Sequence, residues 1–242
     1  MVSPLADDPR LLAGVVLAYT AATLGGSVVF GPGTWFDRVD PVSRVFRYYG
    51  AVAPLHRRED RIALRVPGTG LEDADLVTDR SEVAFVVALL WVTTYDGLVA
   101  TPPWRDVATA LVGVGVPAVL LYPAALLVGF GVFYGAFRFA VRSGRRRAET
   151  YLPEWTLARR FAPSLLAIAA GYHIAHYLGY LIELSPTLLG ALVSPVAPPS
   201  PVAVVLPAWF QGVALAFVLL GHLGAIWVAH ATAFDLFPGR IQ

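Results

Sequence analysis

The sequence has no cysteine and no lysine, and Met1 is its single methionine. Without cysteine, the chain can form no disulfide, thiolate metal site, iron–sulfur cluster or cysteine nucleophile. Any transition metal or haem would have to be held by histidine, a carboxylate, tyrosine or Met1, and histidine is the realistic donor. Because lysine is absent, every positively charged side chain is an arginine.

Charged residues are also scarce. They make up only 14% of the chain, against 57% hydrophobic residues, which lies outside the range of ordinary soluble domains. A soluble all-α core of this length would have too little polar surface to face water. The net charge is only +1 and no glycine-rich phosphate loop is present, so nothing indicates a nucleic-acid partner. We therefore predict a multi-pass protein of the cell membrane whose main partner is the lipid bilayer.

Five stretches are long and apolar enough to cross a hydrocarbon core about 30 Å thick. They are approximately 11–30, 83–100, 116–140, 161–183 and 208–234. The predicted fold class is an all-α, polytopic bundle of about five transmembrane helices, forming a single domain over 1–242. Before the third span, Gly115 and Pro117 set apart a short helix at about 105–115, expected on the outer surface or as a re-entrant segment.

The distribution of arginine predicts the orientation. The connection 31–82 carries eight arginines and the connection 141–160 carries six, whereas 101–107 carries one and 184–207 has no charged residue. Arginine-rich connections stay in the cytoplasm. The N-terminus is therefore expected outside and the C-terminus in the cytoplasm.

The long cytoplasmic connection contains signals for local structure. Asp40 followed by Pro41 is a strong helix start, because aspartate caps the helix and proline presets the first φ. The predicted helix, at about 41–52, is amphipathic and is expected to lie flat on the inner leaflet. The run Arg61–Val66 indicates a small hairpin with a solvated surface, or alternatively a site where a partner docks.

Four polar side chains fall inside the predicted spans at similar depths: Asp96, His173, His176 and His222. Ionisable groups within a membrane indicate a functional site. His173 and His176 are spaced i, i+3 and share a helix face. With Asp96 or His222 from a neighbouring helix they would form a three- or four-ligand site for zinc, copper or iron. Tyr95, Tyr177 and Tyr180 are expected to hydrogen-bond these ligands.

Haem b is an alternative cofactor. His222 and either His173 or His176 would be its axial ligands. Three glycines, Gly171, Gly221 and Gly224, would leave space for the macrocycle, or would only permit close helix packing. The pair Gly131 and Gly135 indicates helix packing or a homo-oligomer, and other membrane subunits are further candidate partners.

Two other interpretations of the polar cluster require no cofactor. The cluster could form a path for protons or a substrate. Alternatively, the imidazoles could hydrogen-bond each other, Asp96 and the tyrosines, which would only tie the helices together. Hydrogen bonds between helices within membranes are worth only about 1 kcal/mol each, so a purely structural role explains the cluster poorly. We therefore prefer the interpretation that the chain is a metal-handling or redox-accessory protein.

Several segments carry a family resemblance. They are the run YYGAVAPL ending at Leu55, Thr93–Leu98, Thr101–Trp104, Arg160–Leu165 and Tyr172–Tyr177. Over nearly its whole length the chain resembles the C-terminal part of a family of actinobacterial and haloarchaeal polytopic membrane proteins often labelled fenitrothion hydrolase-like. The resemblance implies hydrolysis of organophosphate esters. A metal-dependent version would use a histidine-held metal to activate water, with Asp96 as ligand or general base.

Overall fold

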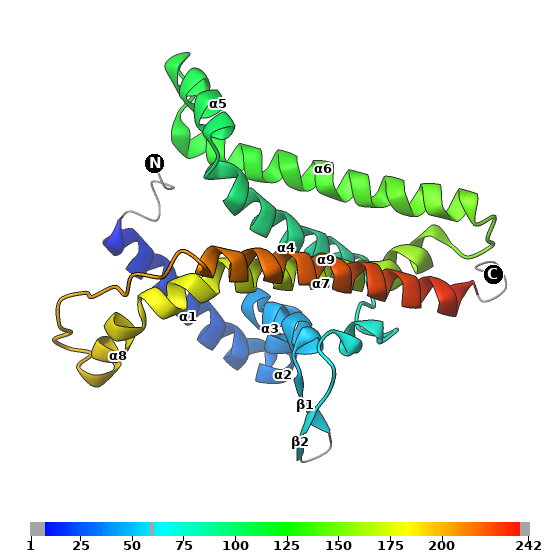
Figure 1. The fold of residues 1–242 in the computed structure, drawn as a ribbon, viewed down its shortest axis with the longest axis horizontal. Helices are drawn as coiled ribbons and strands as arrows, with labels where there is room; N and C mark the ends of the chain where they lie inside the picture. The colour runs from blue at the N-terminus through cyan, green and yellow to red at the C-terminus, as the bar shows by residue number, and fades with distance from the viewer. Residues whose placement is uncertain (1–7, 59–60, 238–242) are drawn as a thin grey trace.

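The structure is a computed structural model that describes residues 8–58 and 61–237. Apart from one hairpin, the regular elements of this part of the chain are helices (Figure 1). Within it, five helices are long and apolar enough to cross a membrane: α1 (Pro9–Phe30), α4 (Arg80–Val99), α6 (Ala118–Arg147), α7 (Glu154–Glu183) and α9 (Phe210–Leu236). The all-α class is confirmed, and these five candidate spans coincide with the five predicted ones.

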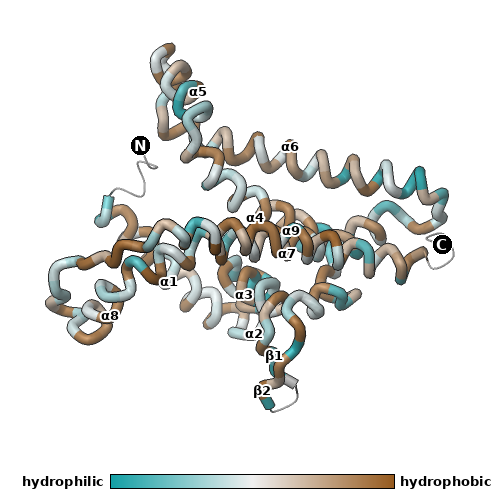
Figure 2. The backbone as a smooth tube through the Cα atoms, viewed as in Figure 1, coloured by the Kyte–Doolittle hydropathy of each residue, from teal (hydrophilic) through white to brown (hydrophobic). Residues whose placement is uncertain are grey.

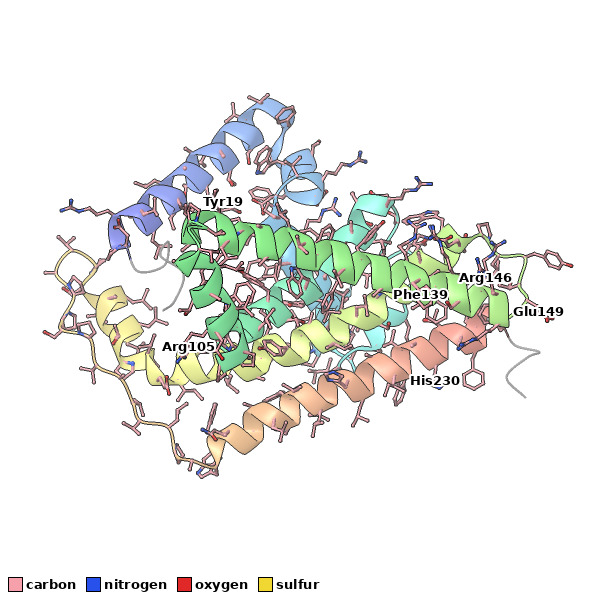
Figure 3. All side chains as sticks on the ribbon, turned by 90° about the horizontal axis from the view of Figure 1, so that it is seen from above. Tyr19, Arg105, Phe139, Arg146, Glu149 and His230 are labelled. Carbon is pink, nitrogen blue, oxygen red and sulfur yellow. The ribbon has the colours of Figure 1, made fainter. Side chains whose placement is uncertain are left out.

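Two of these helices continue well beyond their predicted apolar cores. The structure extends α6 to Arg147 and starts α7 already at Glu154, whereas the predicted spans end at 140 and begin at 161. Glu154 of α7 connects the extended ends of the two helices, because it accepts hydrogen bonds from two arginines of α6, from Nε of Arg138 at 2.7 Å and from Nε of Arg142 at 2.9 Å. Arg146 and Glu149 lie at this end of the long helices and Arg105 lies towards the other (Figure 3).

α7 lies at the centre of the bundle and packs along its length against α9. A Cβ on Gly171 would lie 2.5 Å from the carbonyl oxygen of Phe217 and 2.8 Å from Cα of Gly221. The two backbones therefore touch, which only glycine permits. Gly224 belongs to the same interface, since its Cβ would meet that of Ala167 at 3.5 Å. These glycines serve helix packing.

α4 lies between α7 and α6, and Trp91 joins it to α6. The Nε1 of Trp91 donates to the carbonyl of Leu126 at 2.7 Å, and its ring occupies the space beside Gly129. A Cβ on Gly131 or Gly135, by contrast, would meet nothing within 4 Å. The prediction that these two glycines pack against another helix is wrong within the described part of this chain, and their role in a homo-oligomer stays a prediction.

α1 packs against α2 (Pro32–Arg38), which in turn contacts α3 (Pro41–Val52), and a hydrogen bond joins α1 to the residue that caps α3. The buried carboxylate of Asp40 makes this junction, because it caps α3 by accepting from the amide of Ser43 at 2.6 Å and also accepts from the Tyr19 hydroxyl of α1 at 2.5 Å. Burial alone would raise the pKa of Asp40, but the hydrogen bonds from Tyr19 and Ser43 outweigh burial and lower it.

The predicted bounds and cap of α3 are confirmed, but its surroundings differ from the prediction. Its apolar face, which includes the buried Tyr48 and Ala51, packs on α7 and on the 3₁₀ helix η1 (Thr69–Glu72). A helix lying flat on the leaflet would turn that face to lipid. The reason for the difference is tertiary, since α3 is held on the bundle by ion pairs to Glu82.

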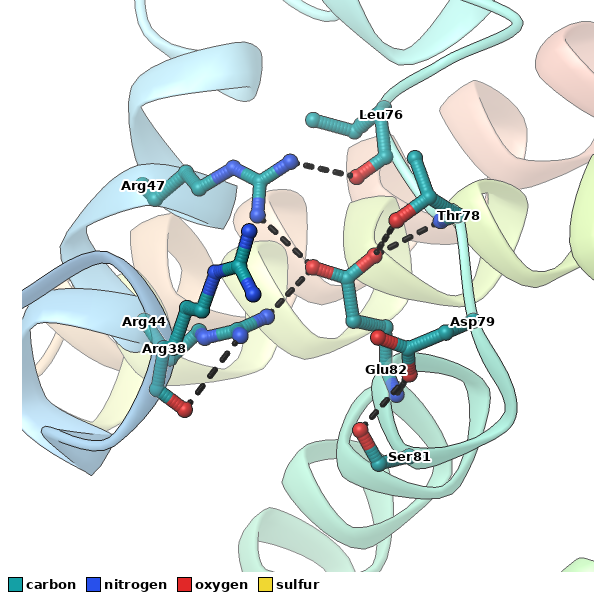
Figure 4. Close-up of polar contacts among 8 residues, drawn as sticks. All are labelled: Arg38, Arg44, Arg47, Leu76, Thr78, Asp79, Ser81 and Glu82. Carbon is teal, nitrogen blue, oxygen red and sulfur yellow. Dashed lines mark hydrogen bonds and ion pairs between the residues drawn. The ribbon is translucent and has the colours of Figure 1, made fainter. Parts of the chain in front are cut away.

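Glu82, at the start of α4, is the centre of this attachment (Figure 4). It accepts from the guanidinium groups of Arg44 and Arg47, the latter at 2.7 Å, and from the amide and hydroxyl of Thr78 at 2.6 and 3.0 Å. Arg47 also donates to the carbonyl of Leu76. The buried carboxylate is thus fully satisfied, which a charge in a low-dielectric site requires.

Three smaller elements complete the fold. The predicted hairpin is confirmed as β1 (Leu55–Arg58) paired antiparallel with β2 (Arg61–Leu64), and it extends away from the helices (Figure 1). The short helix expected before the third span is α5 (Pro102–Gly113), which begins a few residues earlier than predicted. α8 (Ser185–Val193) was not predicted.

Candidate functional site

Asp96 of α4 and His176 of α7 meet as predicted. The Oδ2 of Asp96 lies 2.9 Å from Nε2 of His176, and their side chains are 50% and 35% exposed. Asp96 lies three residues before the end of α4 and His176 lies seven residues before the end of α7. At 1.5 Å per residue the pair is about 5–10 Å from these helix ends. The site therefore lies in the half of the bundle opposite the arginine-rich end.

The pair opens into a pocket of about 210 Å³ between α4, α6 and α7. Its walls are aromatic and apolar apart from the polar groups of the site: Val92, Thr93, Tyr95, Asp96, Leu126, Tyr172, His173, His176 and Tyr177. Tyr172 stacks on the His176 ring with centroids 6.2 Å apart. It can do so because its hydroxyl occupies the space beside Gly97, where a Cβ would lie only 2.2 Å from that oxygen.

His173, also in the pocket wall, is joined to the connection between α1 and α4. Its Nδ1 lies within hydrogen-bonding distance of the Tyr49 hydroxyl of α3 and, at 3.0 Å, of the Ala169 carbonyl oxygen, so the tautomer determines which bond forms. Burial raises the pKa of Tyr49, which keeps its hydroxyl protonated. Tyr49 and Tyr172 were not among the predicted site residues, although both lie in the segments that carry the family resemblance.

His222 does not join the site, contrary to the prediction. It is exposed on α9, and its Nδ1 lies 2.8 Å from the Val218 carbonyl of its own helix. The preceding residue, Gly221, faces α7, so His222 is turned about 100° away from that interface. Gly221 also lies level with Gly171, and Gly171 is about 7.5 Å along α7 from His176, so His222 differs from the pair in height as well as in direction.

The predicted metal centre of three or four ligands is therefore not assembled. Among residues 8–58 and 61–237, no group of three or more histidine, aspartate and glutamate side chains is placed to hold a metal ion. The backbones of Gly171 and Gly221 are in contact, so these glycines leave no space for a macrocycle between α7 and α9, and haem binding stays a prediction. His230 is exposed and lies 2.8 Å, through Nδ1, from its own helix carbonyl at Ile226.

The three predicted tyrosines have different roles. The ring of Tyr177 lies between the two histidines, with centroids 5.4 Å from His173 and 5.0 Å from His176. The ring of Tyr180 lies 5.4 Å from that of His176. Tyr95 instead donates its hydroxyl to the carbonyl of Tyr122 at 2.9 Å, which joins α4 to α6. Tyr177 and Tyr180 thus surround the imidazole of His176, whereas Tyr95 lines the pocket as a packing residue.

Comparison with protein-family models, with curated proteins and with solved structures finds no match to this chain. The class of the protein follows from its own structure: five apolar helices of spanning length identify a membrane protein. Its most distinctive feature is a carboxylate–imidazole pair in a pocket between three of these helices. Any function therefore has to be argued from the pocket.

Proposed function

We propose that the pocket is a proton-exchange site and that the chain is a component of a proton- or substrate-transport system. The observation that carries the proposal is the 2.9 Å approach of Asp96 Oδ2 to His176 Nε2 in a partly open pocket between membrane-spanning helices. Carboxylates and imidazoles that face a cavity inside a membrane are typical of proton relays.

The chemistry of the pair supports this role. With one proton to share between two sites, aspartate and histidine form a neutral pair, so it can exist where an isolated charge would be costly. Loss of that proton leaves one negative charge. The deprotonated pair is therefore a place where a proton or a cation is favoured.

Tyr49 and His173 would extend the path towards the arginine-rich side. His173 lines the pocket, and its Nδ1 is hydrogen-bonded to a hydroxyl carried by α3. A hydroxyl and an imidazole can each accept a proton on one side and donate one on the other. These two groups would then relay protons between the pocket and the connection that α3 belongs to.

The proposal includes an orientation. The arginine-rich connections would face the cytoplasm, which puts the N-terminus outside, the C-terminus inside, and the pocket in the outer half of the plasma membrane. Protons would then reach Asp96 and His176 from the outer side. This is consistent with the distance of the pair from the arginine-rich end of the bundle.

Infrared difference spectroscopy between pH 5 and pH 9 on protein in lipid nanodiscs tests the proposal directly. We expect a protonated-carboxyl band that is absent in Asp96→Asn and shifted in His176→Gln. His222→Gln is the matched control, since it alters a histidine of α9 outside the pocket and should leave the band unchanged. A spectrum that is identical in Asp96→Asn and the unmodified protein would overturn the proposal.

Metal or haem binding and ester hydrolysis are the other outcomes to be measured. A metal at Asp96 and His176 would need further ligands, because no third histidine or carboxylate of the described residues completes the set. Stoichiometric zinc, copper or iron in elemental analysis would show that the pocket binds a metal. A Soret band in the visible spectrum would show that the protein binds haem. Phosphotriester turnover that is lost in His176→Ala would support the activity that the family resemblance implies.

A further inference from the structure

The pocket beside Asp96 has a largely aromatic wall. Three tyrosines and two aliphatic side chains make up most of it: Tyr95, Tyr172, Tyr177, Val92 and Leu126. The rings of Tyr172 and Tyr177 both lie beside the imidazole of His176, with ring centroids 6.2 and 5.0 Å from its own. A ligand in this pocket would therefore meet aromatic rings around a carboxylate–imidazole pair.

The charge of the pocket favours a cation. Among the described residues that line it, Asp96 is the one carboxylate and there is no arginine. The arginines of α6 lie at the far end of that helix, which is its most hydrophilic part (Figure 2). His176 approaches Oδ2 of the half-exposed Asp96, so the carboxylate has a second oxygen, Oδ1, that can face a ligand. Once the shared proton leaves, a bound cation would neutralise the remaining negative charge.

The wall also indicates which kind of cation fits. Calcium and magnesium need about six or more oxygen ligands. In the described part of the chain, no group of three histidine or carboxylate side chains is placed to hold a metal. An organic ammonium ion needs no such shell, because aromatic rings attract it and one carboxylate balances its charge. The volume of about 210 Å³ is below the ~300 Å³ at which pockets accept drug-sized ligands, so the ion would be small.

The exposed lining side chains mark where the pocket opens. They are Val92 and Asp96 of α4 and Tyr177 of α7. Asp96 lies about 5 Å from the end of α4, so the opening is near the end of the bundle opposite the arginines. An ammonium ion with apolar substituents can reach that depth from the membrane interface, where amphipathic molecules collect.

We propose that the pocket binds a small organic ammonium ion in exchange for the proton shared by Asp96 and His176. The inference rests on the proposed function and assigns its substrate class. One-for-one exchange keeps the pocket neutral, since the protonated pair has no net charge and neither does the deprotonated pair with a monovalent cation. The proton passes to solvent when the cation binds and returns when it leaves. The ammonium group would lie at Asp96, with the rings of Tyr172 and Tyr177 beside it.

The groups that can take part in this exchange come from two helices. α6 contributes only Leu126 to the wall, which carries no proton to exchange. The titratable lining side chains are Tyr95 and Asp96 of α4 and Tyr172, His173, His176 and Tyr177 of α7. Because a protonated pair attracts a cation less, the affinity for the ammonium ion should fall as the pH is lowered. The fall should occur over the range in which the infrared carboxyl band of Asp96 appears.

Choline is a suitable probe, because its charge is permanent and 3,3-dimethylbutanol is a neutral molecule of the same shape. Binding of each would be measured to protein in nanodiscs of phosphatidylethanolamine and phosphatidylglycerol, which carry no choline headgroup, against empty nanodiscs. At pH 9 we expect choline to bind about tenfold more tightly than the neutral molecule. Asp96→Asn should remove this preference, together with the dependence of choline binding on pH.

The contribution of the rings is a second measurement. Tyr177→Leu removes a ring beside Asp96 and should weaken choline binding about fivefold, whereas Tyr177→Phe keeps the ring and should bind as the unmodified protein does. His222→Gln is the matched control outside the pocket and should change nothing. Choline affinity that is unchanged in both Asp96→Asn and Tyr177→Leu would overturn the proposal.

Two outcomes separate this inference from the proposed function. A carboxyl band at Asp96 without choline binding that depends on Asp96 would overturn the substrate class and leave proton exchange standing. Absence of the band would overturn proton exchange, and with it the exchange of a proton for a cation. Equal affinity for choline and 3,3-dimethylbutanol would also overturn the inference, because the pocket would then select shape and not charge.

Discussion

Gly171 of α7 and Gly221 of α9 lie backbone against backbone, so that a Cβ on Gly221 would be 2.7 Å from the carbonyl oxygen of Ala167 and 3.1 Å from Cα of Gly171. This contact determines where the two helices cross. It also turns the neighbouring His222 away from the pocket. The contact between these two glycines therefore determines both how α7 packs against α9 and that His222 lies outside the pocket.

Alanine at position 171 should destabilise the protein, because its Cβ would lie 2.5 Å from a backbone oxygen of α9 that has no freedom to move away. We expect a loss of about 1–3 kcal/mol in the free energy of unfolding, typical of overpacking. Thermal unfolding in detergent measures it. Gly131→Ala is the control and should change stability by less than about 0.5 kcal/mol, since no atom lies within 4 Å of its new Cβ. Equal effects would contradict the interface described.

Gly97→Ala should disturb the pocket while leaving the bundle folded. The new Cβ would lie 2.2 Å from the hydroxyl oxygen of Tyr172, so the phenol must move, and it is stacked on His176. We expect the infrared carboxyl band of Asp96 to shift, with a change in melting temperature of only a few degrees. Adding Tyr172→Phe removes the clashing atom and should restore the band. Failure of this rescue would show that Tyr172 does not position the pair.

Glu82→Gln should be among the more destabilising single changes. The carboxylate is only 3% exposed and neutralises Arg44, which is 13% exposed, and Arg47, which is 41% exposed, so its loss leaves the largely buried guanidinium of Arg44 without its counter-charge. Breaking a buried pair costs about 3–5 kcal/mol. Glu154→Gln is the matched control, with a carboxylate that is 24% exposed and also bound to two arginines. Its cost should be about 1 kcal/mol or less by denaturant unfolding, and similar costs for both variants would argue against a buried network.

The junction of α1 and α3 should be sensitive to acid. Because the folded-state pKa of Asp40 is lowered, its carboxylate contributes stability above the unfolded value of about 3.9, and the contribution disappears as pH falls through the folded pKa. The difference in melting temperature between the unmodified protein and Asp40→Asn should therefore be full at pH 7 and shrink below about pH 4. Tyr19→Phe, which removes the 2.5 Å hydrogen bond, should reduce this pH dependence. A difference that stays constant from pH 7 to pH 3 would be inconsistent with a lowered pKa.

Much of the fold could be predicted because it depends on local properties of the chain. Membrane-spanning length and apolarity identify the five long helices, and Asp40 followed by Pro41 marks the start of α3. The meeting of Asp96 with His176 was also predictable, since ionisable side chains inside a membrane need a partner. The outward direction of His222 was not, because α9 is apolar on all sides and its sequence does not mark which face meets α7.

Sequence alone therefore predicted a bundle of helices, five of them long and apolar enough to span a membrane, with polar side chains gathered at similar depths. Helix length and hydropathy are properties of single segments, and they need no knowledge of neighbours. Tertiary structure alone decided that α3 packs on α7, that Tyr49 reaches His173, and that His222 is excluded. These outcomes depend on the rotation and height of each helix, which are determined by contacts such as Gly171 with Gly221 and Arg44 with Glu82, between residues far apart in the chain.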